Sequence, residues 1–221
     1  LAVGAYNSNS LNSSASGEVR IYKYSNSSWT LNKTFQSNTS NTYRGWSVSL
    51  NKKGDMVIFS EPRYNNYRGR IYIYRNTSGT SWQIVGSALE PSSRNYSRLN
   101  SVDINDEGNI IAIGGYGDTI NTEDTGSVWV YKWSNGTDFT SGSYNLLGSR
   151  FDGSDYHKLG YVVSLNDFGN RIAITSQDVI DYDHGSVQMH SIGDIVLNTS
   201  YITISDDISG NDASFNNISL L

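Results

Sequence analysis

Tyrosine and arginine are concentrated in the loops around residues 43–68 and 96–98, where asparagine accompanies them. Tyrosine rings stack on flat or apolar surfaces, and an arginine donates several hydrogen bonds at once, so both types dominate binding hot spots. This composition predicts recognition of a glycan or a protein ligand, with a solvated polar rim as the alternative. The candidate ligand-binding residues are Tyr43, Arg44, Arg63, Tyr64, Asn66, Tyr67, Arg68, Tyr96 and Arg98.

Acidic residues are concentrated in the second half of the chain. Three aspartates, Asp178, Asp181 and Asp183, stand next to His184, and carboxylates with an imidazole can hold a hard cation. No H-E-x-x-H or similar partner motif accompanies them, so we assign no metal and no cofactor and keep the three aspartates as the candidate positions. The other acidic loop residues are Asp118, Glu123, Asp124, Asp152 and Asp155.

Recognisable catalytic motifs are absent from the sequence. It has no G-x-S-x-G element, P-loop or dinucleotide fingerprint. Ser101-Val102-Asp103-Ile104 begins like the S-x-D-x-G-x-x-W box of sialidase-type propellers but lacks its glycine and tryptophan. We therefore predict that the protein is not an enzyme, and keep a glycan-cleaving enzyme that uses Asp181 and Asp183 as a third hypothesis.

Composition and charge exclude further classes of function. The net charge of −5 argues against binding nucleic acid through phosphate neutralisation, and no apolar run approaches the ~20 residues of a membrane span. There is no cysteine for disulfides or thiolate metal sites. Nine N-x-S/T sequons are glycosylation candidates or a chance product of a chain rich in Asn, Ser and Thr: Asn12, Asn26, Asn32, Asn38, Asn76, Asn95, Asn135, Asn198 and Asn217.

A repeat organises the whole chain. A short apolar segment begins at Leu1, Met56, Ile111 and Ile172, with steps of 55, 55 and 61 residues. Each copy is followed by a segment that begins with glycine, at positions 17, 69, 126 and 185. In this segment apolar residues recur at every second position. Its alternate residues share one face, as strands require: Val19, Ile21, Ile71, Ile73, Val128, Val130, Val187 and Met189.

Two further segments complete each unit. One starts at Trp29, Trp82 or Tyr144, and its fourth copy, around 195–197, has lost the aromatic residue. The other ends at Leu50, Ile104 or Leu165 and joins the next apolar segment through a five-residue hairpin containing glycine. Each unit is therefore predicted to be a four-stranded antiparallel meander of about 57 residues, with strands a, b, c and d in chain order.

Radial repetition of such a meander buries both of its faces, so the predicted fold is an all-β propeller of four-stranded antiparallel blades. Residues 1–205 form four blades, the first without its strand a, and residues 206–221 form a polar tail. The small residues Gly4, Ala5, Gly114 and Gly115 are expected at the crowded centre. The aromatic residues Trp29, Trp82 and Tyr144 are expected to pack between blades.

The second repeat contains, in order, the segments Arg44-Gly45, Val48-Ser49-Leu50, a hairpin and Ile58-Phe59-Ser60-Glu61-Pro62. This order of segments resembles the FG-GAP repeat of integrin-α-type propellers. The resemblance covers about residues 1–205 and implies a surface propeller used in adhesion or ligand binding. Many FG-GAP repeats carry a calcium loop between strands a and b. Here that loop, Asn51 to Asp55 and its equivalents, is too short and too poor in carboxylates, so the calcium site is not transferred.

The tail at 208–217 resembles short repeats in structural proteins of large marine viruses. An alternative function is therefore a structural spacer in a virion or an extracellular appendage, and the predicted location is extracellular or on a virion surface. The final Ile218-Ser219-Leu220 echoes Val48-Ser49-Leu50 and could supply the missing strand a of a four-bladed ring. The chain begins in mid-repeat, which instead favours part of a larger ring with further blades of the same protein.

Overall fold

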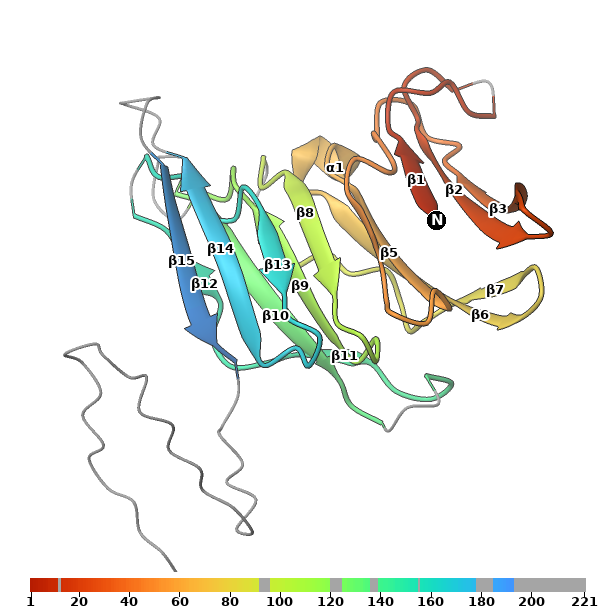
Figure 1. Ribbon diagram of the computed structural model, residues 1–221. Coiled ribbons are helices and arrows are strands. Elements are labelled where there is room, and N and C mark those ends of the chain that lie inside the picture. Colours follow the sequence, from red (N-terminus) through yellow and green to blue (C-terminus); the bar gives the residue numbers. More distant parts are fainter. Residues whose placement is uncertain are drawn as a thin grey trace, which may run out of the picture.

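The computed structural model describes residues 1–11, 13–91, 96–119, 125–135, 139–154, 156–177 and 185–192. Within these ranges the chain forms four antiparallel sheets that lie side by side in chain order (Figure 1). The predicted fourth strand d at 195–197, the tail at 206–221 and the ring-closing segment at 218–220 lie outside the described residues. The all-β architecture of antiparallel blades is confirmed.

Strand order in each sheet follows the predicted meander. The first sheet has strands b, c and d: β1 (Ala2–Ala5), β2 (Glu18–Ser25) and β3 (Ser28–Gln36). The second has all four: β4 (Val48–Leu50), β5 (Met56–Glu61), β6 (Arg70–Ser78) and β7 (Ser81–Ile84). The short turn α1 (Tyr64–Tyr67) joins β5 to β6.

The third sheet is also complete: β8 (Leu99–Ile104), β9 (Ile110–Gly115), β10 (Ser127–Trp133) and β11 (Tyr144–Leu146). The short strand β12 (Phe151–Asp152) pairs with the other end of β10. The fourth sheet has strands a, b and c: β13 (Val163–Leu165), β14 (Arg171–Gln177) and β15 (Gly185–Ser191).

Three apolar clusters lie between successive sheets. Val19, Ile21 and Phe35 of the first sheet pack against Val57 and Phe59 of the second. The second and third sheets share the largest cluster, and the third and fourth share another. Burial on both faces of each inner sheet is what radial repetition of blades predicts, and it stabilises each blade through its two neighbours.

The strand pairing corrects the alignment of the second repeat by one residue. Val57 pairs with Leu50 as Ile111 pairs with Ile104, so Val57, and not Met56, is equivalent to Ile111. A shift of one residue moves every side chain to the opposite face of the strand. Accordingly Val57 packs toward the first sheet, whereas Met56 packs toward the third.

The a–b hairpins are closed by an asparagine at the same position in three repeats. The side-chain oxygens of Asn51, Asn105 and Asn166 each accept a hydrogen bond of 2.9 Å from the backbone N–H five residues later, at the start of strand b. Their amide nitrogens each donate to a side chain of the same loop. The loop is thus held by its own side chains.

Glycines permit the closest approach between sheets. A Cβ added to Gly4 would overlap the carbonyl oxygen of Gly45, and one added to Gly114 would overlap that of Gly160. Gly45 and Gly160 have φ of +82° and +84°, a region that side chains disfavour. Gly4 and Gly114 thus lie at crowded contacts between neighbouring sheets, while their place at the centre of a ring stays a prediction.

The aromatic residues of strand d differ in burial. Trp82 and Tyr144 are buried between sheets, as predicted, with Trp82 only 9% exposed. Trp29 is not packed between sheets among the described residues: it is 55% exposed, and its ring lies 5.1 Å from that of Tyr24 at a tilt of 51°. This position packs against the preceding sheet, and no described residues precede the first sheet.

One buried and one half-buried phenol, Tyr144 and Tyr131, are expected to make the protein sensitive to alkali. Burial raises the pKa of Tyr131 to about 12 and also raises the pKa of Tyr144, above the value of about 10 for an unfolded chain. Above pH 10 the unfolded state releases these protons before the folded state does. It then binds fewer protons, so the free energy of unfolding falls between about pH 10 and pH 12.

Urea unfolding at pH 8, 9, 10 and 11 measures this fall. Tyr131→Phe should show a shallower loss of stability above pH 10 and the wild-type slope below pH 9. The same alkaline slope in Tyr131→Phe and the wild type would contradict the assignment to Tyr131.

Candidate functional site

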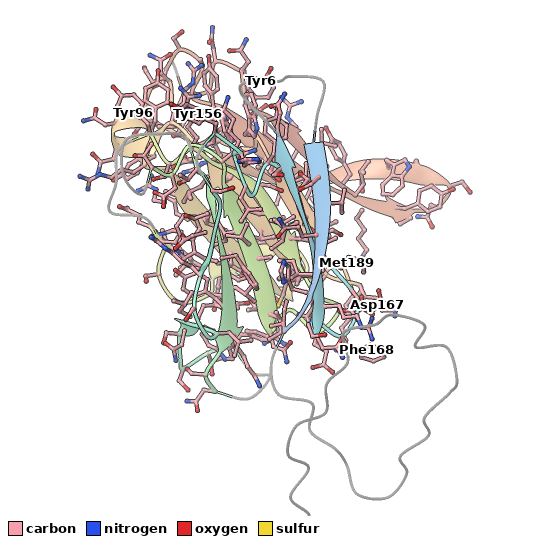
Figure 2. The ribbon with its side chains drawn as sticks, turned by 90° about the vertical axis from the view of Figure 1, so that its left-hand side faces the viewer. Tyr6, Tyr96, Tyr156, Asp167, Phe168 and Met189 are labelled. Atoms are coloured by element: carbon pink, nitrogen blue, oxygen red, sulfur yellow. The ribbon has the colours of Figure 1, made fainter. Side chains whose placement is uncertain are left out.

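The loops divide between the two ends of the stack as the meander predicts. Tyr6 of a b–c loop and Tyr96 and Tyr156 of two d–a loops lie at one end (Figure 2). Asp167 and Phe168 of an a–b hairpin lie at the opposite end (Figure 2). An up-and-down meander places alternate loops at opposite ends, as seen here (Figure 2), and most candidate ligand-binding residues belong to loops of the first end.

Backbone hydrogen bonds join each d–a loop to the preceding b–c loop at this end. The N–H groups of Tyr96 and Arg98 donate to the carbonyls of Asn66 and Tyr67, at 3.1 and 2.8 Å. One repeat earlier, Asn41 and Tyr43 make the equivalent bonds to Ser14 and Ala15. The pairing brings Tyr67 and Arg98, which are 31 positions apart, to the same place.

The d–a loops share an unusual backbone conformation. Tyr43, Arg98 and Lys158 precede equivalent positions of strand a and have φ of 58°, 50° and 41°. Left-handed backbone is uncommon for residues other than glycine. Because it recurs in three repeats, it belongs to the blade design and places one side chain per blade at the rim.

A cavity of about 200 Å³ opens among these loops, between the second and third sheets. We call it the Tyr/Arg cavity. It contains four of the nine predicted ligand-binding residues and four that the sequence analysis missed. Its lining consists of Tyr43, Trp46, Pro62, Arg63, Tyr67, Arg98, Asn100 and Tyr116.

Cations and aromatic rings alternate along this lining. The guanidinium carbon of Arg63 lies 3.8 Å from the ring centre of Tyr43 and 5.4 Å from that of Tyr67. Arg98 donates a hydrogen bond of 3.1 Å to the Tyr116 hydroxyl. Such contacts hold flexible arginines in place. The lining includes two arginines and no carboxylate, so its field favours an anionic group.

Asn100 is a buried polar residue of the lining that is incompletely satisfied in the described protein, as are Ser8 and Ser10 outside the lining. Its side chain is only 8% exposed, and its amide nitrogen donates to the Tyr161 carbonyl at 2.9 Å. Its side-chain oxygen is buried with no hydrogen-bond partner among the described residues. A buried acceptor without a partner costs about 1–3 kcal/mol, so a donor supplied by a ligand would be favoured there.

The remaining predicted ligand-binding residues lie outside the cavity lining. Tyr96 stacks on Tyr67, a lining residue, at 5.4 Å. Arg44 forms a buried ion pair with Glu61 at 2.7 Å, and Tyr64 stacks on Arg70. Asn66 contributes its carbonyl to the loop pairing described above, and Arg68 also follows α1 without lining the cavity. Their role in binding is untested.

The four lining residues that the sequence analysis missed occupy equivalent positions in the second and third sheets. Trp46 and Asn100 stand two residues before the equivalent Val48 and Val102. Pro62 and Tyr116 directly follow the equivalent ends of β5 and β9. Comparison of the same position in successive repeats could therefore have identified all four.

Of the acidic loop residues, Asp118 and Asp152 are described, and they meet at Arg150 and Ser127. Asp118 is fully buried, accepts hydrogen bonds from Ser97 and Ser127, and lies 3.5 Å from Arg150. Asp152 pairs with the same arginine at 2.7 Å. The described residues contain no group of three metal-binding side chains. Glu123, Asp124, Asp155 and the candidate metal positions Asp178, Asp181 and Asp183 lie outside them.

The sequons are a separate prediction that no contact tests. Asn12, Asn95, Asn198 and Asn217 lie outside the described residues. Of the other five, Asn32 accepts a hydrogen bond from the Trp82 indole at 2.9 Å, between the first and second sheets. Asn76 donates to the Gly79 carbonyl at 2.8 Å.

No protein-family model matches the sequence, and no curated protein matches it. Among solved structures the chain is similar to the periplasmic gluconolactonase of Pseudomonas aeruginosa, with 13% identity and a TM-score of 0.52. The match covers 84% of this chain and 48% of that one, so the chain spans about half the length of its neighbour. At this identity the likeness shows the fold, which is of the β-propeller type. No described helix is long and apolar enough to cross a membrane.

This neighbour contradicts the prediction that the protein is not an enzyme. That prediction relied on the absence of familiar motifs together with a fold regarded as a binding module. The solved structure with this fold is an enzyme, a gluconolactonase. Active sites are grafted onto folds, so the fold gives no ground for excluding catalysis.

Proposed function

We propose that the protein binds a carbohydrate that carries a carboxylate, in the Tyr/Arg cavity. The unpartnered side-chain oxygen of Asn100 is the observation that carries this proposal. Asn100 belongs to the lining of a cavity whose other residues are aromatic side chains, a proline and two arginines. A sugar hydroxyl in the cavity can donate to that oxygen once the Asn100 side chain turns toward it.

The remaining lining suits the rest of such a ligand. Sugar rings present apolar C–H faces that pack on aromatic side chains, and four of the lining residues are aromatic: Tyr43, Trp46, Tyr67 and Tyr116. Arginines bind carboxylates through two parallel hydrogen bonds, and Arg63 and Arg98 line the same cavity. A volume of about 200 Å³ is below the roughly 300–1,000 Å³ typical of drug-sized ligands, so it suits one sugar unit.

Binding to uronic-acid oligosaccharides tests the proposal by isothermal titration calorimetry, with neutral glucose oligosaccharides of equal length as the comparison. The wild type should prefer the acidic ligand. Arg63→Gln should weaken its binding about 10- to 100-fold, because a hydrogen bond to a charged group contributes about 1.5–3 kcal/mol. Recovery of the sugar for mass spectrometry shows whether it is also converted.

Arg171→Gln is the matched control, because Arg171 is exposed at the start of β14, next to the hairpin at the opposite end. It should bind like the wild type. The proposal is wrong if neither ligand binds, or if both arginine variants behave alike. Adhesion, an extracellular or virion location and membership of the FG-GAP class remain proposals supported by the fold alone.

A further inference from the structure

The two outermost sheets each present an apolar face that no described residue covers. On the fourth sheet, Val187 and Met189 of β15 are 70% and 71% exposed, and Val162 beside them is also exposed. Met189 projects from the open side of β15 (Figure 2). On the first sheet the exposed apolar residues are Leu1, Val3, Tyr24, Trp29 and Leu31.

The repeat provides an internal control for these exposures. The equivalents of Val187 and Met189 in the other three sheets are between 0% and 4% exposed, because each packs against the next sheet. They are Val19, Ile21, Ile71, Ile73, Val128 and Val130. The fourth sheet thus carries apolar residues for a following blade at positions where exposed β-strands normally carry polar residues.

The exposed face of the first sheet is the other half of the same contact. Trp29 is equivalent to Trp82, which packs toward the preceding sheet and donates its indole N–H to Asn32. Val3 is equivalent to Phe59, which belongs to the same cluster. The first sheet therefore carries the side of the interface that the fourth sheet lacks.

We propose that a second copy of this chain covers the fourth sheet, with the first sheet of the second copy packed on Val187 and Met189. This contact repeats the internal sheet-to-sheet interface between molecules. The chain matches 48% of the length of its structural neighbour, so two copies supply about one such propeller. Head-to-tail contacts of this kind close into a ring if the rotation per blade allows it. Otherwise they form an open, extended assembly.

Light scattering during gel filtration of the 221-residue chain tests the proposal. The wild type should have at least twice the monomer mass of 24.4 kDa. Val187→Asp/Met189→Asp removes the fourth-sheet face, and Trp29→Asp/Leu31→Asp removes the first-sheet face. Each variant alone should be monomeric, because every contact requires one face of each kind.

An equimolar mixture of the two variants is the decisive measurement, because it retains one intact pair of faces. It should form a heterodimer although neither variant associates alone, and this complementation also shows that both variants are folded. Phe168→Ser is the matched control, since Phe168 is 81% exposed in an a–b hairpin away from both faces. It should associate like the wild type.

A monomeric wild type overturns the proposal, and so does a mixture that stays monomeric. If the wild type is monomeric while Met189 is protected from oxidation, another segment of the same chain covers the face and the second copy is excluded. The outcome is independent of carbohydrate binding, because neither variant changes a residue of the Tyr/Arg cavity.

Discussion

Glu61→Ala is expected to lower the free energy of unfolding by about 3–5 kcal/mol, because it leaves two arginines without their shared partner inside the protein. The Glu61 side chain is fully buried at the end of β5. One carboxylate oxygen accepts from Arg44 at 2.7 Å, and the other accepts from Arg70 at 2.9 and 3.1 Å. Both guanidinium groups also stack on Tyr72, at 4.8 Å.

The loss should be large because the cluster joins two sheets. Arg70 begins β6 of the second sheet, and Arg44 also donates a hydrogen bond to the carbonyl of Gln36 in β3 of the first. A domain of this kind has a total stability of about 5–15 kcal/mol, so a loss of this size is a large part of the total.

Urea denaturation of Glu61→Ala and Lys52→Ala measures the difference. Lys52 pairs with Asp106 at 2.6 Å, but the lysine side chain is 68% exposed, and such pairs contribute at most about 1 kcal/mol. Glu61→Gln should also be destabilised, because it retains the shape and loses the charge. Equal midpoints for Glu61→Ala and Lys52→Ala would show that the buried cluster is not stabilising.

The strands were predictable from the sequence, but the alignment of the second repeat was not predictable from apolar periodicity. Met56, Val57, Ile58 and Phe59 are all buried, since the sheet has a neighbour on each side. A strand buried on both faces loses the alternation that would reveal which residues share a face. The hairpin asparagine supplies the missing phase, because Asn51 and Asn105 each stand five residues before strand b.

The sequence predicted at which end of the molecule the candidate site lies better than it predicted which residues line it. Tyr43, Arg63, Tyr67 and Arg98 do converge on one cavity. Arg44, like Arg98, is an arginine of a d–a loop, but it does not line the cavity. Its partner Glu61 is 17 positions away and is brought to it only by the pairing of β4 with β5. Loop composition cannot distinguish an arginine that is paired inside the protein from one that lines a cavity.

Gly114→Val is expected to lower the free energy of unfolding by about 3 kcal/mol, at the upper end of the range for overpacked interiors. A Cβ at this position would overlap the backbone carbonyl oxygen of Gly160 and lie 3.0 Å from its carbon. Backbone cannot rotate away as a side chain can, so the third and fourth sheets must separate. That movement also removes contacts between Val128 and Ile174 and their neighbours in the shared cluster.

Gly185→Val is the matched control for this substitution. Gly185 is exposed at the start of β15, and among the described residues a Cβ there meets only the Ser176 carbonyl oxygen, at 3.1 Å. Valine favours strands, so this variant should stay within about 0.5 kcal/mol of the wild type in urea denaturation. Gly4→Val should behave like Gly114→Val, because its Cβ would overlap the Gly45 carbonyl in the same way. If Gly114→Val were as stable as Gly185→Val, the close glycine contact would not set the spacing between blades.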